Sequence, residues 1–267
     1  MSEADDTPAH ASLSPASAAA YGVHLLTASG IACMFLAAAE IARPLPRPWL
    51  VFVYFLIATV IDGVDGPLAR KFGVKTHAPN ISGRTIDDIV DYLGFTFLPM
   101  LLVWRMGWLP GEIVGAVVVV LVMMASLLGF AHANAKDEQA GFFRGFPSYW
   151  NLVAIYNGFA FALLGTAGQW LNVAVLLALA VLTVLPVWMV YPNLAPPKWK
   201  PIVLIGSYLW AVGLMAMLPW FPDRVPGWLV LLSLAFPAFY GWLSLHLRDR
   251  WPQRVKLDFH SNESARL

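Results

Sequence analysis

The sequence predicts an all-α protein that crosses a membrane eight times, and three observations support this prediction. Hydrophobic residues make up 59% of the 267 residues, and the mean hydropathy is +0.65. Charged residues make up only 12%, against roughly 25% in a typical soluble domain. Apolar stretches of about 20 residues, long enough to cross the hydrocarbon core as helices, recur between prolines, glycines and charges.

Eight such stretches follow one another along the chain. The fifth and sixth are joined by little more than residues 165–169, which predicts a tight antiparallel pair. The acidic segment 1–17 is expected to be a disordered tail, residues 18–247 the transmembrane domain, and residues 248–267 a basic tail. The spans are expected at residues 20–41, 48–68, 86–104, 111–133, 149–167, 170–191, 202–220 and 227–247.

The distribution of Lys and Arg predicts the orientation of these spans. With the N-terminus in the cytoplasm, all but four of the 17 Lys and Arg residues fall on the cytoplasmic side, as the positive-inside rule requires. Both termini are therefore expected in the cytoplasm. The net charge of +1 provides no field that would attract nucleic acid, and the single cysteine, Cys33, excludes a disulfide framework. The four exceptions are Arg43, Arg47, Arg105 and Arg224.

Acidic residues gather where the second span ends and the third begins. Asp62 and Asp65 are three residues apart, and Asp87 and Asp91 are four apart, so each pair lies on one helical face. If the two helix ends lie side by side, four carboxylates converge and repel one another. Two divalent cations would neutralise them, and oxygen ligands suit Mg²⁺ or Mn²⁺. Asp88 points away from this face and is expected at the surface or in a supporting role.

Small residues alternate with these acids. Gly63, Gly66 and Ala69 leave the helix face between the carboxylates bare, so that a flat nucleotide could approach the backbone. Gly83 begins the next helix, whose first amide groups favour an anion. Arg70 supplies a permanent positive charge with a geometry matched to phosphate. The pattern predicts a site for a phosphate-bearing nucleotide.

The acids have two alternative interpretations. The acids could be ordinary solvated charges paired with Arg70, Lys71 and Arg84, but four carboxylates on two matched faces favour a site. They could also form the transport site of a cation transporter, which would place them near the bilayer midplane. Here they lie at one end of the spans.

The acids and small residues together form a long motif, D-x2-D-G-x2-A-R followed by G-x3-D-x3-D. This motif resembles the signature of the CDP-alcohol phosphotransferase family, and every position is filled. It covers about 30 residues directly, and the hydrophobic layout extends the likeness over the first six spans, which implies a six-helix core plus two helices. The resemblance implies that Asp62, Asp65, Asp87 and Asp91 hold two metal ions, that Asp91 also takes the proton of the acceptor hydroxyl, and that Gly63, Gly66, Ala69, Arg70 and Gly83 bind the CDP group.

Three features are similar to the bacterial phosphatidylcholine synthase branch of that family. The spacer at 71–82 is longer than in most members, eight spans are expected where most have six, and residues 142–151 read FFRGFPSYWN. This likeness implies transfer of the phosphatidyl group from CDP-diacylglycerol to choline with release of CMP. It also implies Mn²⁺ or Mg²⁺, an inner-membrane homodimer, and a site that faces the cytoplasm.

A choline acceptor calls for aromatic side chains, because a quaternary ammonium is held over ring faces. Candidates on the active side are Tyr149, Trp150 and Tyr191, with Asn151 nearby, although Trp and Tyr also gather at any membrane interface. Serine, inositol and glycerol phosphate are alternative acceptors. Few cationic residues lie in the fourth and sixth loops, which argues mildly against an anionic acceptor such as glycerol phosphate. Serine stays an alternative acceptor.

Overall fold

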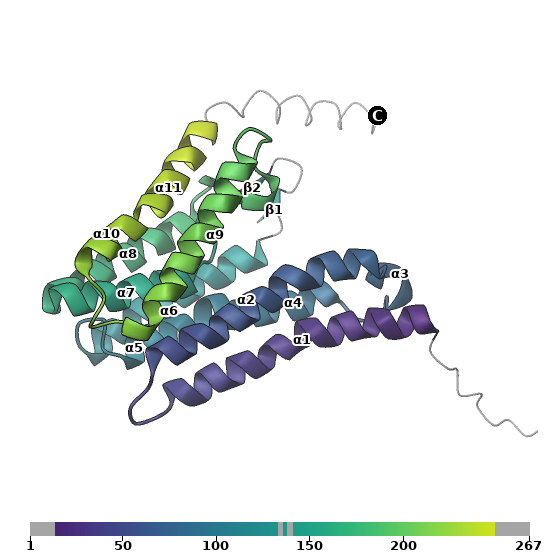
Figure 1. Ribbon diagram of the computed structural model, residues 1–267. Helices are drawn as coiled ribbons and strands as arrows, with labels where there is room; N and C mark the ends of the chain where they lie inside the picture. Colours follow the sequence, from purple (N-terminus) through teal and green to yellow (C-terminus); the bar gives the residue numbers. More distant parts are fainter. Residues whose placement is uncertain (1–13, 133–135, 138–140, 249–267) are drawn as a thin grey trace, which may run out of the picture.

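The computed structural model describes residues 14–132, 136–137 and 141–248, and most of them are helical (Figure 1). Residues 1–13 and 249–267, and with them most of both expected tails, lie outside the described residues. Helix α1 begins within the segment expected to be a tail, where the Ser14 side chain accepts a hydrogen bond from the Ser17 N–H at 3.1 Å. The elements are α1 (Pro15–Ile41), α2 (Pro48–Lys71), α3 (Val74–His77), α4 (Gly83–Asp91), the π-helix η1 (Tyr92–Phe97), α5 (Leu98–Arg105), α6 (Glu112–Ala131), β1 (Lys136–Asp137), β2 (Phe142–Arg144), α7 (Trp150–Leu164), α8 (Thr166–Val184), β3 (Trp188–Val190), the 3₁₀ turn η2 (Pro192–Leu194), α9 (Lys200–Met217), the 3₁₀ turn η3 (Leu218–Trp220), α10 (Gly227–Ser233) and α11 (Ala235–Arg248).

Within the described residues, six helices are long and apolar enough to cross a membrane: α1, α2, α6, α8, the run from α9 through η3, and the run from α10 into α11. Large apolar side chains on them face outward, as expected of a surface in contact with lipid: Leu25 is 72% exposed and Ile113 80%. The chain is therefore a multi-pass membrane protein.

The other two expected spans have unusual forms. The third is divided among α4, η1 and α5, which follow one another without a break. The fifth is α7, whose 15 residues make a helix about 22 Å long, shorter than a hydrocarbon core of about 30 Å. That the chain crosses the membrane eight times, with both termini in the cytoplasm, remains a prediction.

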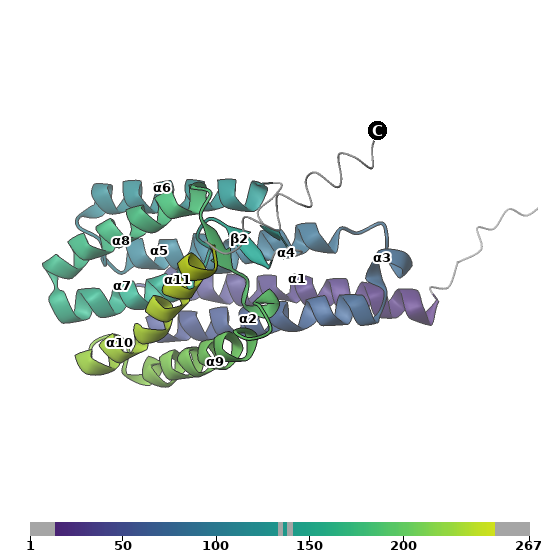
Figure 2. The ribbon, with the colours of Figure 1, turned by 90° about the horizontal axis from the view of Figure 1, so that it is seen from above.

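A buried ion pair closes the hairpin of α1 and α2, which run side by side in both views (Figures 1 and 2). Glu40 is 4% exposed, and its carboxylate accepts hydrogen bonds from Nε and Nη2 of Arg47, each at 2.9 Å, and from the Arg47 backbone N–H at 3.1 Å. Nε of Arg43 lies 3.3 Å from the same carboxylate. The buried charge is thus paired and bonded, as burial requires.

Helix α4 runs parallel to α1 and packs on it through small residues. A Cβ built at Gly30 of α1 would lie 2.7 Å from Cγ1 of Val90, and one built at Gly94 of η1 would lie 3.0 Å from Sδ of Met34. Real Cβ atoms do not come as close as the first distance, so the missing side chain at Gly30 allows the two backbones to approach. This packing sets the position of α4 relative to α1.

An aromatic cluster around Phe221 joins segments that lie far apart in the sequence. The centroid of the Phe221 ring lies 5.2 Å from the ring centroid of Phe52 in α2, 5.1 Å from that of Phe159 in α7 and 5.8 Å from that of Trp108. The ring planes in each pair meet at angles between 61° and 84°. Such edge-to-face pairs are a favoured geometry for aromatic rings. The segment from η3 into α10 is therefore packed into the same core as the earlier helices.

The structure corrects the all-α expectation in one place. The sixth span was expected to continue to residue 191, but α8 ends at Val184 and Leu185 is extended, with ψ at 147°. Pro186 is the cause, because a proline disfavours helical backbone at the residue before it. Trp188–Val190 then forms β3, which pairs antiparallel with β2, and β2 pairs antiparallel with β1.

The α1–α4 contact predicts the effect of a small change. Gly30→Ala should lower the melting temperature of the detergent-solubilised protein, because overpacking a close contact costs about 1–3 kcal/mol. Gly22→Ala, also in α1, is the matched control, since no atom lies within 4 Å of its Cβ position. Equal melting temperatures for the two variants would contradict this account of the packing.

Candidate active site

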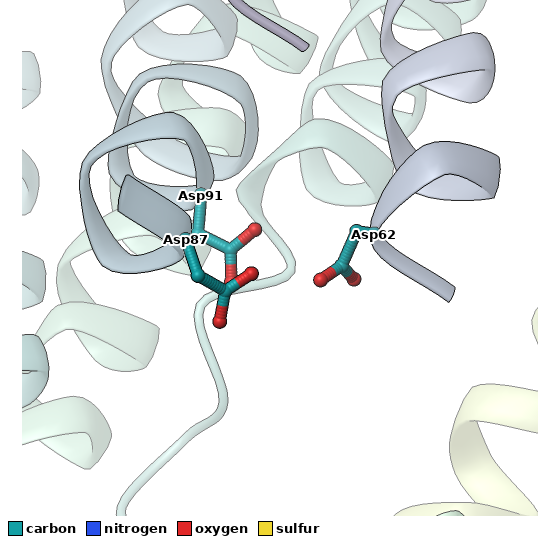
Figure 3. A group of neighbouring side chains, drawn as sticks. All are labelled: Asp62, Asp87 and Asp91. Atoms are coloured by element: carbon teal, nitrogen blue, oxygen red, sulfur yellow. The ribbon is translucent and has the colours of Figure 1, made fainter. Parts of the chain in front are cut away.

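Three carboxylates from two helices meet in one place. Asp62 lies on α2, and Asp87 and Asp91 lie one turn apart on α4. One carboxylate oxygen from each residue lies within 4.8 Å of the other two, and Figure 3 shows the two α4 side chains directed across the gap at Asp62. All three side chains are partly buried. The structure thus brings together three of the four acids predicted from the spacing.

The other two acids of the segment lie elsewhere. Asp65 follows Asp62 on α2 and is buried, with 7% exposed, and it is not part of the group of three. Asp88 points away from the group, and its carboxylate lies 3.6 Å from Nε of Arg84. This surface ion pair agrees with the helical spacing.

The face of α2 beside Asp62 is open, as predicted from its small residues. No atom lies within 4 Å of the Cβ position of Gly63. The atom nearest to the Cβ position of Gly66 is Nη1 of Arg70, at 3.7 Å, so the guanidinium extends over that glycine. Ala69 is partly buried and Arg70 exposed. The arrangement leaves room beside the carboxylates with a cationic group at its edge.

A histidine that sequence reasoning did not assign to the site packs against Gly83. His24 of α1 is 4% exposed, and a Cβ at Gly83 would lie 2.9 Å from its Cε1 and 3.1 Å from its Nδ1. The Nε2 atom is buried and has no hydrogen-bond partner among the described residues. The signal for His24 in the sequence was that it is a polar residue inside an apolar run. That signal did not show that α1 passes the start of α4.

The donor set of the group fits a hard divalent cation. Carboxylate oxygens are the ligands that Mg²⁺ and Mn²⁺ prefer, and Mg²⁺ is commonly held by one or two carboxylates together with substrate phosphates. Two ionised carboxylates 4.8 Å apart repel by about 3 to 4 kcal/mol at an effective dielectric constant of about 20. A cation bound between them would remove that repulsion.

Residues 23–185 match the model of the CDP-alcohol phosphatidyltransferase family. The chain belongs to this family. It is also similar to curated proteins named phosphatidylcholine synthase. The protein of that name from Pseudomonas aeruginosa is 32% identical, over 86% of this chain and 92% of its own length. The one from Bradyrhizobium diazoefficiens is 35% identical, over 85% and 80%, and the one from Agrobacterium fabrum is 33% identical, over 81% and 85%.

These matches confirm the family and the enzyme class that the motif predicted. The CDP-alcohol phosphatidyltransferase segment extends from α1 to the residue after α8, so it contains all three grouped carboxylates. Strand β3 and helices α9–α11 lie beyond it, although the relatives match most of the chain.

One of the four aromatic-region candidates lies near a carboxylate, and a second lies near the first. The Tyr149 hydroxyl is within electrostatic reach of both Asp62 and the Tyr191 hydroxyl. The Tyr191 ring packs against that of Phe143 in β2, with centroids 4.4 Å apart. Because Tyr149 precedes α7 and Tyr191 follows β3, only the folded chain brings these two tyrosines together.

The other two candidates face inward. Trp150 is fully buried and packs on Phe146 with ring centroids 5.3 Å apart, and its Nε1 has no partner among the described residues. Asn151 is 8% exposed, and its Oδ1 accepts a hydrogen bond from the Leu152 N–H at 2.9 Å. Both side chains are therefore part of the protein interior.

A chain of hydroxyl groups connects the carboxylate helix to this aromatic region. Thr96 of η1 bonds to Ser126 of α6 at 2.8 Å, and Ser126 bonds to Ser148 at 2.7 Å. The Tyr92 hydroxyl donates to the Met123 carbonyl at 3.1 Å, again between η1 and α6. The π-helix after Asp91 is thereby fixed on the side opposite α1, and π-helical turns often occur at functional sites.

The contact at Gly83 leads to a test with two backgrounds. Gly83→Ala should reduce phosphatidyl transfer about tenfold or more, since its Cβ would force the start of α4 off the buried His24 ring. In a protein that also carries His24→Ala, Gly83→Ala should reduce the transfer rate by a smaller factor. The measurement compares initial rates of the parent, the two single variants and the double variant. An equal loss in both backgrounds would show that the Cβ acts on the bound nucleotide and not on His24.

Proposed function

We propose that this protein transfers the phosphatidyl group from CDP-diacylglycerol to choline and releases CMP. The observation that carries the proposal is the convergence of Asp62 with Asp87 and Asp91 beside an open helix face. The similarity to proteins named phosphatidylcholine synthase supports choline as the acceptor.

In this proposal Asp62, Asp65, Asp87 and Asp91 hold two divalent cations, Mn²⁺ or Mg²⁺. The oxygen donors of the group fit such ions. Bound cations of this kind neutralise a pyrophosphate and stabilise the leaving phosphate. Asp65 is the member that lies apart, buried on α2.

The residues around the acids bind and orient the donor. Gly63, Gly66, Ala69 and Gly83 leave space for the CDP group, and Arg70 pairs with phosphate oxygens through its planar guanidinium. The arrangement keeps the nucleotide at the end of the membrane-spanning helices, so that the acyl chains of the same molecule extend along their apolar faces.

Asp91 accepts the proton of the acceptor hydroxyl. The choline oxygen attacks the lipid-side phosphorus, and the bond from that phosphorus to the CMP oxygen breaks, so the phosphatidyl group passes directly to choline. A carboxylate is a weak base for an alcohol, so the proton leaves as the new bond forms. No nucleophilic side chain with an adjacent base is needed.

The trimethylammonium end of choline binds against Tyr149 and Tyr191, with Trp150 and Asn151 behind them. A quaternary ammonium cannot donate a hydrogen bond and gains its attraction from ring faces, at about 0.5–2 kcal/mol per ring. The closeness of Tyr149 to Asp62 supports this placement, because choline must reach the reacting phosphate.

We further propose that the protein is a homodimer in a bacterial inner membrane, with the site facing the cytoplasm. The distribution of Lys and Arg supports the orientation, because it favours the carboxylate end of the helices on the cytoplasmic side. The homodimer and the inner membrane follow from the resemblance to the bacterial phosphatidylcholine synthase branch.

The acceptor is tested directly by supplying the purified protein with CDP-diacylglycerol, Mn²⁺ and one acceptor at a time. We expect CMP release with choline to exceed that with serine, inositol or glycerol phosphate by at least about tenfold, because choline alone among them carries a quaternary ammonium, which ring faces bind without a hydrogen bond. A higher rate with serine would overturn the choline assignment and leave the family reaction in place.

The role of Asp91 is tested by Asp91→Asn, with Asp88→Asn as the control. The first should leave no more than a few per cent of turnover, because removing a general base costs about 10²- to 10⁴-fold. The second removes only a surface ion pair and should keep nearly full activity. Substantial turnover by Asp91→Asn with metal still bound, measured by calorimetry, would reject Asp91 as the base.

A further inference from the structure

Helix α11 lies beyond the family segment, yet it is bonded to a strand beside the candidate site. In the described residues the sheet order is β1-β2-β3, so β3 is an edge strand whose outward backbone groups need partners. The Val190 N–H donates to Oγ of Ser244 at 3.2 Å, and the Val190 carbonyl accepts from the Tyr240 hydroxyl. The Ser244 hydroxyl donates in turn to the Tyr240 carbonyl at 2.8 Å.

The backbone groups that these bonds satisfy belong to a buried residue. Val190 and Ser244 are both fully buried, and the Tyr240 side chain packs on the small cluster of Phe142, Val190 and Ala195. Two side chains of α11 therefore occupy the positions where another strand would pair. Loss of either one would leave a buried backbone group without a partner.

The residue directly after this attachment is Tyr191. Its N–H donates to the Gly141 carbonyl at 2.8 Å, and its ring lies against Phe143. Its hydroxyl is within electrostatic reach of Tyr149, which is itself within reach of Asp62. The position of one wall of the acceptor region thus depends on where β3 is held.

We propose that Tyr240 and Ser244 are positioning residues for the acceptor site, which hold Tyr191 beside Tyr149 through the backbone of Val190. The inference rests on the proposed function, and it assigns to the C-terminal helices the binding of the quaternary ammonium acceptor. The α4 carboxylates are held by contacts in which β3 takes no part, with α1 and, through η1, with α6. Weakening the attachment of β3 should therefore affect choline and spare the nucleotide lipid.

The experiment measures both Michaelis constants and kcat for the full-length protein in lipid nanodiscs. Tyr240→Phe and Ser244→Ala should each raise KM for choline about three- to tenfold, the effect of losing one hydrogen bond of ordinary strength. KM for CDP-diacylglycerol should stay within about twofold of the parent. Tyr208→Phe and Ser207→Ala on α9 are the matched controls, since Tyr208 is 69% exposed and Ser207 bonds only within its own helix turn.

The outcomes separate this inference from the proposed function. If the parent protein does not use choline, the proposed function fails. If the parent uses choline and both variants keep its KM for choline, or if the variants change both Michaelis constants equally, the positioning role is rejected. Tyr240→Phe keeps the size of the ring, so the two variants together distinguish a lost bond from a misfolded chain.

Discussion

The close approach of like charges is the constraint on which this structure depends. Asp62, Asp87 and Asp91 each place an oxygen within 4.8 Å of the other two. Ionised carboxylates so close together repel unless a cation lies between them, and the repulsion strengthens as the dielectric constant falls. Without such a cation, the surrounding fold has to keep the two helices at that separation. The packing around α4 can be understood as the means of holding it.

Helix α4 is fixed from two sides by different kinds of contact. On the side of α1 the contacts are steric: Gly83 meets the buried ring of His24, and Gly30 receives Val90. On the side of α6 the contacts are hydrogen bonds of η1, the π-helix that continues α4, including that of Thr96 to Ser126. Steric contacts set how near the helices come, and the bonds resist rotation about the helix axis. Together they set where the α4 carboxylates point.

The aromatic region is held by a further set of contacts. The helices of the CDP-alcohol phosphatidyltransferase segment supply the carboxylates, while the short sheet carries Tyr191 and is attached to α11 through Val190. In Figure 1 α11 lies in the upper part of the molecule and α1 in the lower part, so the helices that support the two parts of the candidate site lie apart from each other. Such a division would allow the acceptor region to differ between relatives while the carboxylates keep their arrangement.

The sequence by itself determined the membrane class, the family motif and which acids share a helical face, because hydropathy and the 3.6-residue period are local properties. The outward direction of Asp88 also follows from that period. Only the tertiary structure decided that His24 meets Gly83, that Asp65 lies apart from the group of three, and that β3 pairs with β2 and is attached to α11. Contacts between segments distant in the chain depend on how whole helices pack, and no local period encodes that packing.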